Sequence, residues 1–101
     1  MSDRDVTSLN DEYDLWLSPE LRTLDLVSET GELAKEVVTA QDYGAREFEL
    51  TDDLVDEFGD VYYCLLSLAA ELDIDPDEAL AASVEKYRSR LDERGDAGSE
   101  T

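Results

Sequence analysis

The chain has 101 residues, of which 28 are Asp or Glu and 8 are Lys or Arg, so its formal net charge is -20 at pH 7. This balance disfavours nonspecific binding to nucleic acid, which depends on cations neutralising phosphates, and a single cysteine excludes an intrachain disulfide. Apolar residues still make up 42% of the sequence, which predicts one folded domain over residues 1–94, followed by a flexible acidic tail at 95–101.

Two helices are predicted before residue 44. After a frayed start at residues 1–5, the first is marked by residues that recur at helical spacing: Thr7, Leu9, Tyr13, Trp16 and Leu17. Serine is a favoured helix cap and proline a favoured first residue, so Ser18 and Pro19 predict the start of the second helix. Gly44 is a natural stop for that helix.

The second predicted helix has two opposed faces. At about 100° per residue, its acids fall in one narrow stripe: Asp25, Glu29, Glu32 and Glu36. Leu24 and Val27 lie on the other side, with further apolar residues. From charge alone, such a stripe is typical of the solvated face of an amphipathic helix, and this interpretation is kept for Asp25 and Glu36.

Two further helices are predicted after a connector at residues 44–50. Thr51, followed by two acids, is a good start for a third helix that runs to about Leu72. Its apolar arc exceeds half the circumference, which predicts that a second copy of the chain covers part of it. Asp75 and Pro76 begin a fourth helix. The sequence therefore predicts an all-α fold, a compact bundle of about four helices that assembles as a dimer or a dimer of dimers.

Two segments of the same form stand out, Glu29-Thr30-Gly31-Glu32 and Glu57-Phe58-Gly59-Asp60. In each, the two acids are three residues apart and share a helix face. Glycine inside a helix costs about 1 kcal/mol relative to alanine, and here that cost recurs one residue before the second acid. The missing side chain predicts close approach of a neighbouring helix or a ligand, and four hard oxygen donors suit Mg²⁺ or Mn²⁺. Because histidine is absent, any catalysis would rest on carboxylates and a metal.

The longer segments Glu29-Thr30-Gly31-Glu32-Leu33-Ala34 and Asp56-Glu57-Phe58-Gly59-Asp60-Val61 resemble the E-x-G-E-L-A and D-E-[LF]-G-D-V segments of the MazG family, within the all-α NTP pyrophosphatase superfamily. The resemblance covers about residues 13–91. It implies an all-α enzyme that works as a dimer or higher oligomer and hydrolyses a nucleoside triphosphate to monophosphate and pyrophosphate. It also implies Mg²⁺, with Mn²⁺ as a possible substitute, held by four catalytic acids: Glu29, Glu32, Glu57 and Asp60. One of these, or Glu36, would accept the proton of the attacking water.

Candidate substrate contacts are the scarce basic residues and one aromatic residue. Lys86 and Arg90 share a face of the last helix and, like Arg22, are candidates for contact with phosphates. Trp16, together with Tyr13, could stack on a base. Each has a structural alternative, since Lys86 and Arg90 could only complement the negative end of their own helix and Trp16 could be a core anchor.

Three functions are consistent with the sequence. The first is a Mg²⁺-dependent nucleoside triphosphate pyrophosphohydrolase that cleans the nucleotide pool. The second is an enzyme of the same superfamily specific for phosphoribosyl-ATP or a deoxynucleotide, and the third is a non-enzymatic acidic interaction module.

Self-repulsion at this charge needs salt screening, which predicts a halophile. No apolar run is long enough for a bilayer or typical of a signal peptide, so we expect a cytoplasmic protein without membrane or nucleic-acid partners.

Overall fold

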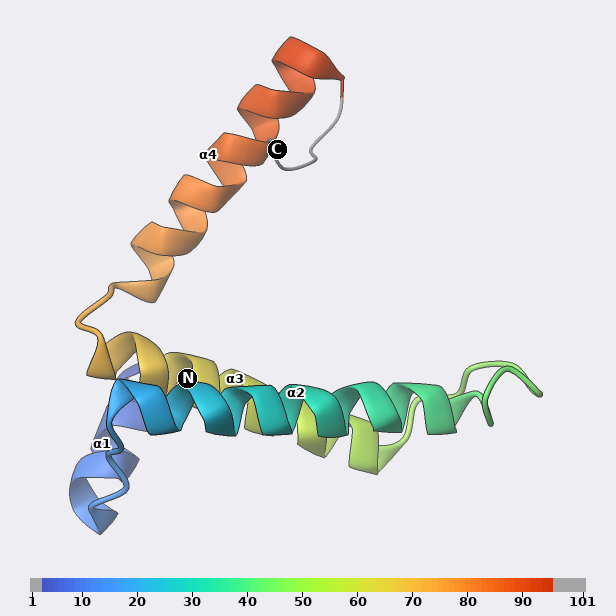
Figure 1. Ribbon diagram of the computed structural model, residues 1–101, viewed down its shortest axis with the longest axis horizontal. Helices are drawn as coiled ribbons and strands as arrows, with labels where there is room; N and C mark the ends of the chain where they lie inside the picture. The colour runs from blue at the N-terminus through green and yellow to red at the C-terminus, as the bar shows by residue number, and fades with distance from the viewer. Residues whose placement is uncertain (1–2, 96–101) are drawn as a thin grey trace.

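The computed structural model of the chain describes residues 3–95, which form four α-helices (Figure 1). Their bounds are α1 Asp3–Tyr13, α2 Pro19–Ala40, α3 Asp52–Glu71 and α4 Pro76–Arg94. No strand occurs within these described residues, so the all-α prediction is confirmed. Except for Gly95, the predicted tail lies outside them. Across residues 3–95, no helix is both long enough and apolar enough to cross a bilayer.

The starts of α2, α3 and α4 follow the predicted capping residues. Ser18, Thr51 and Asp75 each precede a helix, and a side-chain oxygen of each accepts a backbone N–H of the first turn. These bonds satisfy donors that have no partner inside the helix. The end of α2 was predicted less well, because the helix stops at Ala40, four residues before Gly44.

The first helix lies closer to the N-terminus than the periodicity predicted. It begins at Asp3 and ends at Tyr13, so the predicted frayed start is helical from Asp3 onward. Asp14 has a φ of 55°, a left-handed conformation that ends the helix. Trp16 consequently lies in the linker to α2, not on the first helix.

The helices α2 and α3 run antiparallel, side by side, and α1 packs on α3 (Figure 1). Asn10 anchors α1, because it is fully buried and its Nδ2 donates to Ser67 Oγ at 3.0 Å. The hydroxyl of Tyr63 donates to Asn10 Oδ1 at 2.6 Å. This contact between α1 and α3 is therefore polar and fully paired, which is the condition for burying polar groups without penalty.

Replacing Ser67 by alanine should destabilise the fold by about 1–3 kcal/mol, because the buried amide of Asn10 loses a partner. Urea unfolding followed by circular dichroism measures the difference. The matched control is Ser28→Ala, which removes an exposed hydroxyl from α2. Equal unfolding midpoints for the two variants would contradict the structural role of the Asn10 contact.

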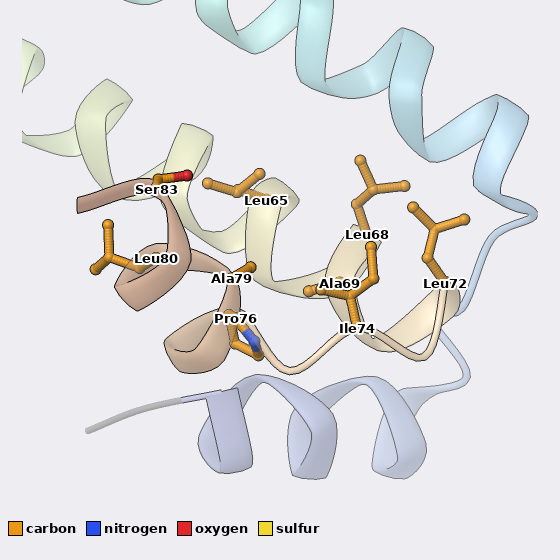
Figure 2. Close-up of a pocket in the computed structure, with 9 residues that line it drawn as sticks. All are labelled: Leu65, Leu68, Ala69, Leu72, Ile74, Pro76, Ala79, Leu80 and Ser83. Carbon is orange, nitrogen blue, oxygen red and sulfur yellow. The ribbon is translucent and has the colours of Figure 1, made fainter. Parts of the chain in front are cut away.

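The predicted compact bundle is not what one chain forms. The helix α4 projects away from the α2–α3 pair (Figure 1), and none of its residues is buried. The Cα radius of gyration is 16.7 Å, whereas a compact domain of this length has about 13 Å. Where α4 departs from α3, an apolar cavity of about 340 Å³ lies between Leu65, Leu68 and Ala69 of α3 and Leu80 of α4 (Figure 2).

The helix α2 turns its acidic stripe toward α3 and its apolar stripe outward. Leu24 and Val27 are 66% and 65% exposed, whereas Asp25, Glu29 and Glu36 are half-buried. Asp25 also accepts hydrogen bonds from Arg22 and Cys64, so it is more than part of a solvated face, whereas the solvated role of Glu36 stays a prediction. Periodicity identified the two faces correctly but not the direction in which each one points.

Candidate metal centre

Three of the four predicted acids meet where α2 and α3 face each other. One carboxylate oxygen from each of Glu29, Glu57 and Asp60 lies within 4.8 Å of the others. Glu57 and Asp60 are three residues apart on α3, and Glu29 faces them from α2. The pairing of two rigid helices thus brings Glu29 next to two acids that follow it by 28 residues or more in sequence. The three carboxylates are close enough to face one ion.

The fourth predicted acid, Glu32, is not part of this close group. It is exposed on α2, and the group of three does not include it. Its charge still reaches the centre, because repulsion from Glu32 contributes to raising the pKa of both Glu29 and Glu57. The structure therefore places Glu32 at the edge of the cluster.

The electrostatics of the cluster are unfavourable without a cation. Desolvation is the largest cause of the raised pKa of Glu29, followed by repulsion from Asp60. Desolvation also raises the pKa of Glu57, followed by repulsion from Glu29. Oε2 of Glu57 is buried and has no hydrogen-bond partner among residues 3–95, an arrangement that costs free energy unless something compensates. A hard divalent cation fits this all-oxygen donor set and would supply the missing partner.

The motif glycines do not make the close contacts that were predicted. A Cβ built on Gly31 or on Gly59 would meet no atom within 4 Å. Within one chain, therefore, no neighbouring helix requires glycine at either position. The space beside the second acid of each motif is open instead.

Replacing Glu57 by glutamine should stabilise the metal-free protein at pH 7. Folding raises the pKa of Glu57, so ionisation of this carboxyl destabilises the folded state. The effect is absent below the ordinary pKa of 4.5 and grows as the pH rises toward the pKa of the folded state. Above the folded pKa it is fully present. Glutamine does not ionise and escapes this effect. In EDTA, we expect a higher Tm than wild type at pH 7 and a smaller difference below pH 4.5. Glu47→Gln, in the exposed connector, is the control, and equal behaviour of the two variants would contradict the electrostatic account.

Arg22 was predicted to contact phosphate, and the structure corrects this prediction. Its side chain is 3% exposed. Nε donates to both carboxylate oxygens of Glu71 at 3.2 Å, and Nη2 donates to Glu71 Oε2 at 3.1 Å and to the carbonyl of Leu15 at 2.8 Å. Nη1 donates to Asp25 Oδ2 at 3.4 Å. Every guanidinium nitrogen is engaged inside the chain, so none is available to a substrate.

Asp25 is a residue near the site that sequence reasoning missed. Besides Arg22, its Oδ2 accepts a hydrogen bond from the thiol of Cys64 on α3, at 3.2 Å. Burial and this bond raise the pKa of Cys64 to about 12, so the thiol stays protonated and is no nucleophile. The available signal was the position of Asp25, four residues before Glu29 on the same stripe.

The remaining predicted contacts lie in the linker before α2 and on α4. Trp16 is half-buried in the linker, and its Nε1 donates to Asp11 Oδ1 at 2.8 Å. On α4, Lys86 Nζ and Arg90 Cζ lie 5.1 Å and 5.8 Å from the ring centre of Tyr87. Because α4 diverges from the α2–α3 pair (Figure 1), the same chain does not bring these cations to the acids.

Comparison with known proteins identifies the family. The sequence model of the MazG nucleotide pyrophosphohydrolase domain matches residues 17–95. The uncharacterized protein YpjD of Bacillus subtilis (strain 168) is 32% identical over 105 residues, which cover 93% of each chain. No solved structure matches significantly. The three clustered acids all lie within the matched region, and the chain belongs to the MazG family of nucleotide pyrophosphohydrolase domains.

Proposed function

We propose that the chain is a Mg²⁺-dependent nucleoside triphosphate pyrophosphohydrolase. The reaction adds water at the α-phosphorus, breaks the bond between the α- and β-phosphates, and gives the monophosphate and pyrophosphate. The observation that carries the proposal is the buried, partnerless Oε2 of Glu57 inside a cluster of three acids. Family membership supports a nucleotide as the substrate.

The chain's own contribution is a set of carboxylates fixed on two helices. Glu29, Glu57 and Asp60 would hold the cation, and we assign Glu32, at the edge of the cluster, to a fourth position. When bound, Mg²⁺ or Mn²⁺ neutralises phosphate charge and activates water. One of these acids, or Glu36 on the same stripe, accepts the proton of the water. Without neutralisation, a chain at -20 would repel a triphosphate.

We further propose a dimer or a dimer of dimers as the working form. Leu24 and Val27 on α2 and Phe58 on α3 are each more than 60% exposed, and the cavity in Figure 2 is lined by apolar side chains. Burying such surface contributes about 25 cal/mol per Å². A second copy could cover these faces and bring Lys86 and Arg90 of its α4 toward the acids as phosphate contacts.

The base-binding role of Trp16 and the cellular setting belong to the same proposal. Trp16 is partly exposed in the linker, which supports stacking on a base. The charge of -20 supports a salt-rich cytoplasm, as in a halophile, where screening reduces self-repulsion. We propose that the enzyme there removes damaged or surplus nucleotides.

Incubation with a panel of triphosphates in Mg²⁺ and concentrated KCl, followed by ³¹P NMR, tests the proposal. The panel holds the ribonucleotides, the deoxynucleotides and phosphoribosyl-ATP. We expect monophosphate and pyrophosphate in the presence of Mg²⁺ and neither in EDTA. Turnover of phosphoribosyl-ATP alone, or of one deoxynucleotide alone, would support the narrower enzyme. No pyrophosphate from any compound would overturn the enzymatic proposal and favour an interaction module.

A further inference from the structure

A line of polar contacts crosses the α2–α3 interface next to the acidic cluster. On α2, Arg22, Asp25 and Glu29 occupy successive turns of the same face. Arg22 pairs with the carboxylate of Glu71 at the far end of α3, and Asp25 accepts the thiol hydrogen bond of Cys64. Cys64 lies four residues after Asp60 on α3. The bond between Asp25 and Cys64 therefore joins the two helices one turn away from the metal-binding acids on each.

The Asp25 carboxylate is itself held in place. Its Oδ2 accepts from Arg22 Nη1 at 3.4 Å, and Nε and Nη2 of the same guanidinium are bonded to Glu71. Arg22 is 3% exposed, and the Glu71 side chain is 4% exposed. The Asp25 side chain is 41% exposed, but the guanidinium that contacts it is held by the buried ion pair with Glu71. The hydrogen bond from Cys64 then links Asp25 on α2 to α3.

An acid at position 25 has a cost within the metal-free chain. The Asp25 carboxylate adds a further negative charge one turn from Glu29 on the same face of α2. The three clustered acids also repel each other across the interface, which favours separation of α2 from α3 where a cation needs them close. The hydrogen bond between Cys64 and Asp25 opposes this separation one helical turn away from the cluster. It therefore compensates for the cost of placing an additional acid at position 25.

We propose that Cys64 and Asp25 are positioning residues for the metal centre, whose hydrogen bond sets the spacing between Glu29 on α2 and the acids of α3. The inference rests on the proposed function, because it assumes that the cluster binds a divalent cation. It adds two residues that the family motif does not contain. Neither residue is a ligand in this account, and neither touches the substrate.

Calorimetric titration of Mn²⁺ into the metal-free protein in concentrated KCl tests the inference without any activity assay. Removing a hydrogen bond made directly to a metal ligand weakens metal affinity by about 10- to 100-fold. The Cys64–Asp25 bond lies one turn from the ligands, so Cys64→Ala should show the lower end of this effect and bind Mn²⁺ about 10-fold more weakly than wild type. Cys64→Ser should recover most of the affinity, because its hydroxyl can donate to Asp25. Ser67→Ala is the matched control, since it removes a buried hydrogen bond from the same helix, directed to α1.

The variants separate positioning from stability, with the Tm of each metal-free protein measured alongside. We expect Ser67→Ala to lower the Tm and keep the affinity for Mn²⁺. Equal weakening in Ser67→Ala and Cys64→Ala, or no rescue by Cys64→Ser, would overturn the inference. Full affinity in Cys64→Ala would overturn it as well and leave the proposed function standing. Absence of Mn²⁺ binding by the wild type would instead refute the proposed function.

Discussion

Replacing Glu57 by glutamine should remove nearly all pyrophosphate release at saturating substrate, with kcat lowered by more than about 100-fold. Loss of an outer-shell partner alone costs about 10- to 100-fold in metal affinity or activity, and Glu57 is expected to bind the cation directly. In glutamine one carboxylate oxygen becomes an NH₂ group, which is a hydrogen-bond donor and no metal ligand. The buried Oε2 is the oxygen that we expect to face the cation. A coupled pyrophosphate assay across a series of Mg²⁺ concentrations measures the effect.

The control for this variant is Glu47→Gln, which makes the same change in charge within the exposed connector. We expect it to keep wild-type activity. Since Glu57→Gln is also expected to raise the Tm of the metal-free protein at pH 7, its inactivity cannot be a result of unfolding. Wild-type turnover by Glu57→Gln at low Mg²⁺ would show that this carboxylate does not hold the cation.

Replacing Arg22 by methionine should destabilise the protein by about 3–5 kcal/mol, because it leaves the buried carboxylate of Glu71 without a cation, with only the backbone N–H of Leu17 as a partner. The loss is large relative to the roughly 5–15 kcal/mol that stabilises a typical domain. The substitution also removes the hydrogen bonds that the carbonyl of Leu15 and the carboxylate of Asp25 accept from Arg22. Urea unfolding in concentrated KCl, where the surface charges are screened, measures the change.

The double variant Arg22→Met with Glu71→Leu is the control for this prediction. It removes both charges, and an apolar pair of similar volume is often as stable as a buried ion pair. The double variant should therefore be more stable than Arg22→Met alone. A loss below about 1 kcal/mol in the single variant, the range of exposed ion pairs, would contradict the buried role assigned to Arg22.

Local features of the fold could be predicted from the sequence because local chemistry determines them. Ser18, Thr51 and Asp75 cap helices at the positions predicted from their side chains. The all-α class follows from the helical periodicity of the apolar residues. The direction of each helix face could not be predicted. Leu24 lies outward in one chain, and a second copy is the partner we propose for it.

In the candidate site, too, local features could be predicted and contacts between distant residues could not. Repeated spacing identified Glu29, Glu57 and Asp60, because residues three or four apart share a helix face whatever packs against it. Arg22 was misassigned because its partner Glu71 is 49 residues away, and a tertiary ion pair has no local signature. Asp25 was missed for a similar reason, since its role depends on Cys64 in the facing helix.

We propose that this polyanion engages a triphosphate only through a divalent cation held by Glu29, Glu57 and Asp60. Calorimetric titration of α,β-methylene-ATP, whose carbon bridge resists hydrolysis, tests it most directly. The account predicts binding to the wild type in Mg²⁺, no binding in EDTA, and no binding to Glu57→Gln in either condition. Equal binding with and without Mg²⁺, or unchanged binding by Glu57→Gln, would contradict it.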